Sequence, residues 1–426
     1  MGLFQYAGMD ALARWFLQTP LLPKLPVFKY VVEANMPPSW TPVFFSSSTL
    51  RELCLYGHDT ESMHQAINLI TPIITMLDNL TIQLPSGSRL HSLLAENGFL
   101  WKHSRLQSLQ LSCVVVITPT MIYILSQLPA LCYLSLHKPQ LMLPTVDNNS
   151  PLASSDDAFP RLRSLQLEST FTEATLFLGA TPPLRGLESL NLTLNVRKPG
   201  PDAVDRMSQA SLHSLYSRFP RSLSSLRLHF LAITGPLYMG LLPNFSEVTT
   251  PLFSFPRLRT LSLHQTYASL IPPLDSHLNS LTDTALRSIA PAWPELEVFE
   301  YEVKDFARRG PDGDYPTFDS IIAFAQAHPR LGRLSLPFMN LLRLPHASLR
   351  PTTSPQKQGH PLQQLEIGAH IGTSYALDNA TLLSETARAF LDAFPNLETT
   401  TFPPWAPAPK AFSEVLADAM ASLKAS

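Results

Sequence analysis

Large apolar side chains recur along this chain in the order Leu-x-x-Leu-x-Leu, with mostly polar residues at the x positions. A weak copy with Leu25, Phe28 and Tyr30 comes first. Twelve clearer copies follow at intervals of 25 to 38 residues, beginning at Leu50, Leu77, Leu106, Leu131, Leu162, Leu187, Leu223, Leu258, Leu296, Leu331, Leu362 and Leu397. Because the last two leucines of a copy are two residues apart, they point to the same side of an extended strand. The pattern therefore predicts one short strand per copy.

A single strand of this kind cannot bury its own apolar side. Strands stacked about 4.8 Å apart form a continuous parallel sheet over a continuous leucine core. The interval between copies is longer than a strand and a turn require, so it leaves room for a helix on the return path. We therefore predict an α/β leucine-rich-repeat solenoid with a curved parallel sheet and outer helices.

Apolar residues at helical spacing predict the helices between the strands. The predicted ranges are Ser62–Leu77, Pro119–Leu128, Asp202–Arg218, Thr282–Ala290, Phe318–Ala327 and Thr381–Phe394. Thr282 with Asp283, and Thr381 with Glu385, are residue types that cap the start of a helix. A proline stands shortly before the next Leu-x-x-Leu in most copies, where it ends the helix and directs the chain into the strand.

The composition excludes several classes of function. Charged residues are 15% of the chain, against about 25% in average proteins, and the net charge is −2. We therefore expect no nucleic acid and no membrane among the partners. The chain begins without a signal-peptide pattern, and its three cysteines form neither a disulfide framework nor a metal-binding spacing. These features predict a monomer in the cytoplasm or nucleus.

Arginines gather where the strands begin, for example Arg163, Arg259 and Arg330. They predict either a basic stripe or a solvated edge that pairs with the carbonyl groups at helix ends, and we favour the solvated edge.

We divide the chain into three parts. Residues 1–49 are expected to form an N-terminal cap and a partial first repeat, residues 50–402 the solenoid, and residues 403–426 a Pro-rich linker with a capping helix. Short terminal helices are expected at Asp10–Gln18 and Pro409–Ala425. The insertions expected to be loops are Lys138–Asp157, Thr234–Ser254, Asp305–Thr317 and Pro337–Pro361.

The sequence carries no catalytic motif: it has no phosphate-binding Gly-rich loop, no Gly-x-Ser-x-Gly, no His-Glu-x-x-His and no Cys-x-x-Cys. Aligning the repeats places His229, His264 and Glu302 in one row on adjacent strands. Such a row suits a metal site or a pH-sensitive patch. We favour a polar binding face that contains two histidines, and we predict no metal, no cofactor and no catalytic residue.

The side chains that point away from the leucine core are mostly small, polar and of mixed sign. We predict that they form the concave face of the solenoid and bind a protein partner, with charge complementarity setting specificity. The candidate binding residues are Glu168, Thr193, Arg227, His229, His264, Glu300, Glu302 and Arg333.

Two copies of the repeat, Phe159–Leu167 (FPRLRSLQL) and Phe255–Leu263 (FPRLRTLSL), resemble the repeats of fungal F-box/leucine-rich-repeat proteins. The resemblance covers about residues 50–402. It implies a substrate receptor of a cullin-type ubiquitin ligase, in which an F-box grips the ligase adaptor and the repeats hold the substrate. Residues 1–49 do not carry the Leu-Pro-x-Glu opening of an F-box. The adaptor is therefore an expected partner only where an F-box is present.

We therefore predict an intracellular, non-enzymatic recognition module, the substrate-binding part of an F-box-type receptor. The alternative is a scaffold or regulator without a ligase link, such as a GTPase-activator-like repeat protein, although 403–426 is not the acidic tail common in that class. A β-helix hydrolase is disfavoured, because such an enzyme requires paired acids on adjacent coils. The identity of the partner and the completeness of the N-terminus stay open.

Overall fold

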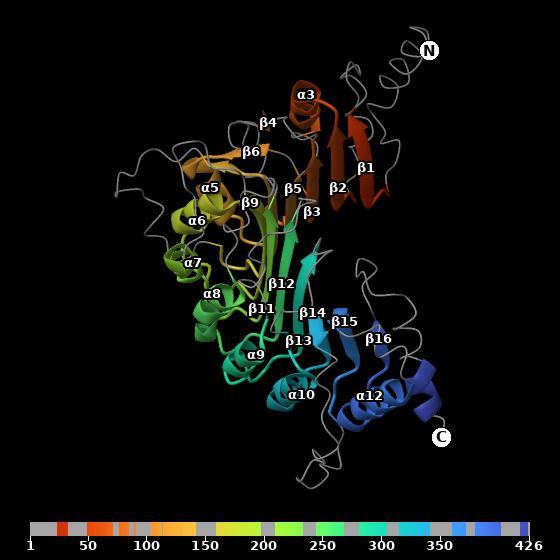
Figure 1. Ribbon diagram of the computed structural model, residues 1–426. Coiled ribbons are helices and arrows are strands. Elements are labelled where there is room, and N and C mark those ends of the chain that lie inside the picture. The colour runs from red at the N-terminus through yellow and green to blue at the C-terminus, as the bar shows by residue number, and fades with distance from the viewer. Residues whose placement is uncertain are drawn as a thin grey trace. The chain divides into compact units, whose positions relative to one another are not determined.

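The computed structural model shows a succession of parallel strands, most of them followed by a helix (Figure 1). It describes residues 24–32, 49–70, 76–84, 89–90, 104–112, 114–141, 159–196, 209–232, 244–267, 281–304, 315–340, 360–371, 380–401 and 418–424. The chain forms two compact units, Met1–Leu192 and Thr193–Ser426.

Unit 1 contains a parallel sheet whose strand order follows the chain. Its strands are β1 (Val27–Val32), β2 (Glu52–Gly57), β3 (Asn79–Gln83), β5 (Ser108–Ser112), β7 (Tyr133–His137) and β9 (Ser164–Thr170). A smaller sheet consists of β4 (Arg89–Leu90), β6 (Val114–Ile117) and β8 (Gln140–Leu141), and the helices are α3 (Thr60–Ile70), α5 (Pro119–Ser126) and α6 (Phe171–Ala180). The weak first copy of the repeat forms β1, in which Phe28 pairs with Leu53 and Tyr30 with Leu55.

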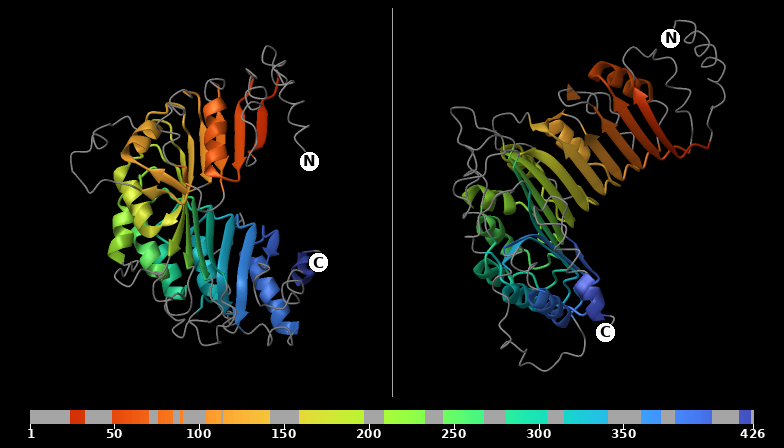
Figure 2. Two further views of the ribbon diagram at one scale, coloured as in Figure 1. Left: turned by 90° about the horizontal axis from the view of Figure 1, so that it is seen from above. Right: turned by 45° about the vertical axis from the view of Figure 1, so that its right-hand side comes forward.

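Unit 2 repeats the arrangement with longer strands. After β10 (Ser189–Val196), which contains the boundary, come β11 (Ser225–Ala232), β12 (Thr260–Tyr267), β13 (Val298–Lys304), β14 (Arg333–Asn340), β15 (Gln364–Ile371) and β16 (Thr399–Thr401). The helical elements are α7 (Gln209–Tyr216), α8 (Phe245–Thr249), the 3₁₀ helix η5 (Thr250–Ser254), α9 (Asp283–Ile289), α10 (Phe318–Ala327), α12 (Ala380–Ala393) and a short helix at 418–424. The sheet of unit 2 curves, with these helices along its outer side (Figure 2).

The leucines of the repeat form the core between sheet and helices. Leu226 and Leu261, which are paired in register, are both fully buried, as are Leu334 and Phe299 on the next strands. The structure confirms the predicted α/β leucine-rich-repeat solenoid with parallel strands and outer helices.

The same backbone link joins successive strands at their entry. One carbonyl oxygen accepts two consecutive N–H groups from the next repeat: Arg51 O accepts from Asp78 (2.8 Å) and Asn79 (2.9 Å). Glu297 O accepts in the same way from Gly332 (2.8 Å) and Arg333 (3.2 Å). These links need no particular side chain, so they set the register of strands even where the repeat sequence varies.

The proline noted before many strands lies in a tight turn whose first residue has a buried ring. Leu258 N donates to Phe255 O (3.2 Å), and Leu296 N donates to Trp293 O (3.1 Å). The rings of Phe255 and Trp293 are 4% and 0% exposed. Proline fits the second position of such a turn because its φ is already fixed near the required value. The ring anchors the turn in the core, and this explains the recurring Phe-Pro sequence.

Threonine and asparagine side chains cap the starts of α5, α6, α8, α9 and α10. Thr282 accepts a hydrogen bond from Ala285 N (3.2 Å), as predicted for α9. The predicted cap at Thr381 is wrong, because α12 already begins at Ala380 and Thr381 lies inside it. Thr170 and Asn244 form complete capping boxes with Glu173 and Glu247, two helix starts that the sequence prediction missed.

Several predicted boundaries require correction. α10 has the predicted bounds, whereas α3 begins at Thr60 and is described to Ile70, rather than spanning Ser62–Leu77. The insertion predicted at Thr234–Ser254 contains α8 and η5, because Asn244 starts a helix there. Strand β14 runs to Asn340, past the predicted loop start at Pro337. The helix predicted at Asp10–Gln18 lies outside the described residues.

Candidate functional site

The strand register places polar side chains of unit 2 in two rows on the sheet side opposite the core. His229 pairs with His264, which pairs with Glu302, so the row predicted from the repeat alignment is present. In the second row Ser262 pairs with Glu300, and Arg227 pairs with Ser262.

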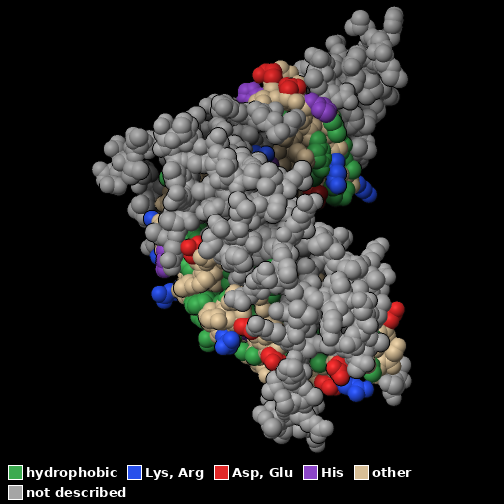
Figure 3. Space-filling view, viewed as in Figure 1, with side chains coloured by type: hydrophobic (Ala, Val, Ile, Leu, Met, Phe, Trp, Pro, Cys, Tyr) green, Lys and Arg blue, Asp and Glu red, His purple; other side chains and the backbone are tan. Residues whose placement is uncertain are grey.

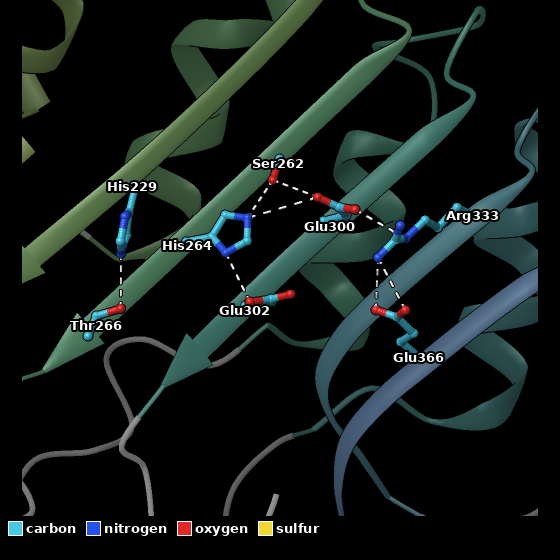
Figure 4. A network of polar contacts seen from close by, with 8 residues as sticks. All are labelled: His229, Ser262, His264, Thr266, Glu300, Glu302, Arg333 and Glu366. Carbon is cyan, nitrogen blue, oxygen red and sulfur yellow. Dashed lines mark hydrogen bonds and ion pairs between the residues drawn. The ribbon is translucent and has the colours of Figure 1, made fainter. Parts of the chain in front are cut away.

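His264 connects the two rows through short contacts (Figure 4). Its Nδ1 lies 2.9 Å from Glu302 Oε2, and its Nε2 lies 2.5 Å from the hydroxyl of Ser262. The Ser262 hydroxyl in turn donates to Glu300 Oε2 over 2.7 Å. The side chains of His264 and Glu302 are each 18% exposed and that of Glu300 is 9% exposed, so these contacts form in a largely desolvated layer.

Arg333 extends the network across the next two strands. Its Nε lies 3.1 Å from Glu300 Oε1, an ion pair without hydrogen-bond geometry, and its terminal nitrogen donates to Glu366 Oε1 (3.1 Å) and Oε2 (3.3 Å). A guanidinium suits this place because its planar fork holds two carboxylates in fixed directions. We call Ser262, His264, Glu300, Glu302, Arg333 and Glu366 the polar network.

Ser262, His264 and Glu302 touch in the order of a hydrolase triad, but Ser262 cannot act as its nucleophile. The residue is completely buried, and its hydroxyl already donates to the Glu300 carboxylate. A nucleophile must instead reach a bound substrate and give its proton to the base. These contacts therefore hold the side chains of the face in place, and Ser262 does not serve as a nucleophile.

The row of histidines does not form a metal site. His229 Nε2 contacts Thr266 Oγ1 at 3.0 Å, and its ring meets that of His264 edge-on with centroids 5.9 Å apart. Within the described part of the chain, no three His, Cys, Asp or Glu side chains are grouped so as to hold a metal ion.

The structure brings four of the eight candidate residues into the polar network, namely His264, Glu300, Glu302 and Arg333. His229 adjoins it through the ring contact, and Arg227 is exposed beside Ser262 and makes no ion pair among the described residues.

Two candidates lie elsewhere. Glu168 pairs with His137 in unit 1 (Oε2 to Nδ1 2.6 Å), and Thr193 is on β10. The candidate set left out Ser262 and Glu366, although both occupy the outward position between two strand residues of the core. This outward position in the repeat was the feature of the sequence that could have identified both residues.

The corresponding row of unit 1 begins with Lys29, which pairs with Cys54, and carries no charged side chain from there to β9. Thr81, Gln110, Ser135 and Gln166 pair in register there, with Tyr133 donating to Gln166 Oε1 at 2.9 Å. The charged side chains of the outward rows are thus concentrated on unit 2.

At the strand entries the arginines alternate with acids. Arg163 contacts Glu188 (2.6 Å), and Glu295 receives both Arg259 (3.2 Å) and Arg330 (3.8 Å). Red and blue side chains accordingly lie close together on the part of unit 2 that Figure 3 shows. The edge is solvated, as we favoured, but its arginines pair with carboxylates rather than with carbonyl groups at helix ends. Arg51, at the entry of β2, is an arginine that does bond a carbonyl, that of Met76 (3.0 Å).

No protein-family model matches this chain, and no curated protein matches it. Among solved structures, the chain is similar to the Rad7–Elc1 complex from yeast, with 16% identity over 72% of this chain and 69% of that chain and a TM-score of 0.36. It is also similar to an internalin (InlF) from Listeria monocytogenes, with 13% identity over 79% and 88% of the two chains and a TM-score of 0.33. Similarity at this level does not bear on function. Among the described helices, none has the length and apolar character to cross a membrane.

Proposed function

We propose that this chain is a non-enzymatic protein-recognition module and that its partner binds the outward sheet face of unit 2, over the polar network and Arg227. The observation that carries the proposal is the network itself: it holds charged groups in fixed directions on a face that the helices of the unit leave uncovered. Groups that are already ordered lose little entropy when a partner binds, and their charges select between partners.

The finer proposal is that the module is the substrate-binding part of an F-box-type ubiquitin ligase receptor in the cytoplasm or nucleus. It is supported by the resemblance of the Phe159–Leu167 and Phe255–Leu263 repeats to that family. Cys54 and Cys132, which the structure shows as free thiols, are compatible with a reducing compartment.

Reversing one charge on the face tests where the partner binds. Arg227→Glu changes an exposed side chain in the row of the network, so the fold is expected to stay intact. Arg221→Glu is the matched control: it makes the same charge change at an exposed position of the same repeat, in the turn before β11.

Both variants and the wild type are tagged, recovered from their own cells and crosslinked before mass spectrometry. We expect Arg227→Glu to lose a partner that the wild type and Arg221→Glu retain. In those two proteins, crosslinks should join the partner to the sheet face of unit 2. Equal recovery by both variants would contradict binding at this face. The presence of a cullin-ligase adaptor among the co-purifying proteins tests the finer proposal, and a GTPase in its place would favour the scaffold alternative.

A further inference from the structure

One of the anchoring turns of unit 2 has a histidine where three other turns of the unit have Phe or Trp. Leu331 N donates to His328 O (3.0 Å), the hydrogen bond that forms at Phe255, Trp293 and Phe394 in their turns. The His328 side chain is 0% exposed, and its ring lies 4.3 Å from the ring of Phe324 between centroids. An ionisable ring therefore takes the place of an apolar anchor.

The hydrogen bonds of His328 fit the neutral ring only. Its Nδ1 lies 2.7 Å from the carbonyl oxygen of Phe324, which can only accept, so Nδ1 carries the proton. Its Nε2 is buried and has no hydrogen-bond partner in the structure. A proton added there would bury a charge without an acceptor, and this burial lowers the pKa of His328 below its ordinary value.

His360 joins the following repeat to the same turn. Its Nε2 donates to Ala325 O (2.7 Å) and is 3.2 Å from His328 O, while its Nδ1 accepts from Leu362 N (3.1 Å). Protonating Nδ1 would replace that acceptor with a donor facing an N–H group. His360 thus ties the start of the following repeat to the turn that begins at His328.

We propose that His328, with the hydrogen bonds of His360, forms an acid-sensitive latch between the repeats that begin at Leu331 and Leu362, closed while the His328 ring is neutral and opened when that ring is protonated. The charged groups around the latch do not oppose this. His360 lies close enough to His328 that a positive charge on His360 disfavours a charge on His328. Arg330 in the turn pairs with Glu295 (3.8 Å), and Phe394, which directly follows α12, places its neutral ring 5.7 Å from His360. Among the described residues, no carboxylate pairs with either imidazole.

The latch lies directly before the strands that carry part of the polar network. β14 begins at Arg333, and β15 begins at Gln364, two residues before Glu366. Opening the latch would loosen the first residues of both strands. The Arg333–Glu366 ion pair, which joins these residues, would then be weakened. The latch itself does not depend on the proposed function, since it concerns the stability of the repeats whether or not a partner binds.

Hydrogen exchange of the full chain, corrected for the intrinsic rate at each pH, tests the latch. An ordinary histidine titrates near pH 6.5, so linkage allows protonation of His328 to lower the protection of β14 and β15 by up to about 25-fold between about pH 7 and pH 5. Strands β3 and β5, which contain no histidine, serve as the internal reference. We expect His328→Phe to fold, since Phe occupies the same turn position at Phe255, and to lose most of the pH dependence. His213→Gln, a change of an exposed histidine on α7, is the control and should keep it.

A second measurement needs no variant. Exchange of the imidazole C2 hydrogen, followed by mass spectrometry, reports the titration of each histidine in the wild type. We expect His328 to titrate at lower pH than the exposed His213. Titration of both at the same pH, or a loss of β14 and β15 protection in acid that His328→Phe shares fully with the wild type, would overturn the proposal.

Discussion

Arg333→Met removes the cation of the polar network while keeping most of the volume of the side chain. Glu300 then keeps its hydrogen bond from Ser262 (2.7 Å) but loses the guanidinium 3.1 Å away. Glu366 loses both of its contacts to the Arg333 nitrogen, at 3.1 and 3.3 Å. Two carboxylates are left on the strands to either side of β14, and the more buried of them, Glu300, has a side chain only 9% exposed.

The expected cost follows from the burial of these groups. Breaking a fully buried pair by removing one partner costs about 3–5 kcal/mol, because the remaining charge stays buried. The side chains of Arg333 and Glu366 are 38% and 23% exposed, so water reaches part of the site. We therefore expect Arg333→Met to lower the free energy of unfolding by about 2–3 kcal/mol.

Adding Glu300→Gln should recover part of this loss. The amide oxygen still accepts from Ser262, and the remaining carboxylate, that of Glu366, is partly exposed, so the double variant should lose only about 1 kcal/mol. Urea unfolding of the wild type, both single variants and the double variant measures the coupling. The buried-charge reasoning is wrong if the free energy of unfolding of Arg333→Met is within about 0.5 kcal/mol of that of the wild type. It is also wrong if the double variant is less stable than Arg333→Met.

Three further changes test other parts of the structure. Tyr216→Phe should raise the free energy of unfolding, followed by thermal unfolding, by about 1 kcal/mol, because it removes a buried hydroxyl that has no hydrogen-bond partner among the described residues. Burial of this hydroxyl also raises the pKa of Tyr216. A less stable variant would show that the hydroxyl does have a partner. Asp283→Ala should cost about 1–2 kcal/mol and loosen the start of α10 in hydrogen exchange, because Asp283 accepts from the N–H (2.7 Å) and hydroxyl (3.0 Å) of Thr317; unchanged exchange there would refute the link. The hydrogen bond that Asp59 accepts from the Ser62 N–H lowers the pKa of Asp59 below its ordinary value, so this cap stabilises α3 above about pH 4 and weakens as the pH falls through the folded pKa. The free energy of unfolding should therefore fall less between about pH 5 and about pH 3 in Asp59→Asn than in the wild type.

The repeat pattern predicted the fold because each copy places its leucines identically. Once the two leucines of a strand point into the core, the side chain between them must point outward, and aligning the copies gives the cross-strand neighbours. That reasoning placed His229, His264 and Glu302 in one row, and the register agrees. The same reasoning missed α6 and α8, whose starts were readable as capping boxes at Thr170-x-x-Glu173 and Asn244-x-x-Glu247.

The contacts inside the network were not predictable from position alone. Register places Ser262 beside Glu300 and His264 beside Glu302, but it does not say that His264 bends back to Ser262 on its own strand. That choice depends on side-chain rotamers and on which hydrogen bonds remain after packing. The role of His328 was hidden for a related reason: the sequence pattern shows a turn residue, whereas only the structure shows that its Nε2 is buried without a partner.

The backbone links at the strand entries separate the scaffold from the surface it carries. Each link uses a carbonyl and two N–H groups, so the chain between two strands can lengthen or shorten without moving the strands relative to one another. The spacing between copies indeed ranges from 25 to 38 residues. Mutation can therefore replace the outward residues and change the loops independently, since neither alters the register. A chain built in this way can acquire a new binding specificity while its architecture stays the same.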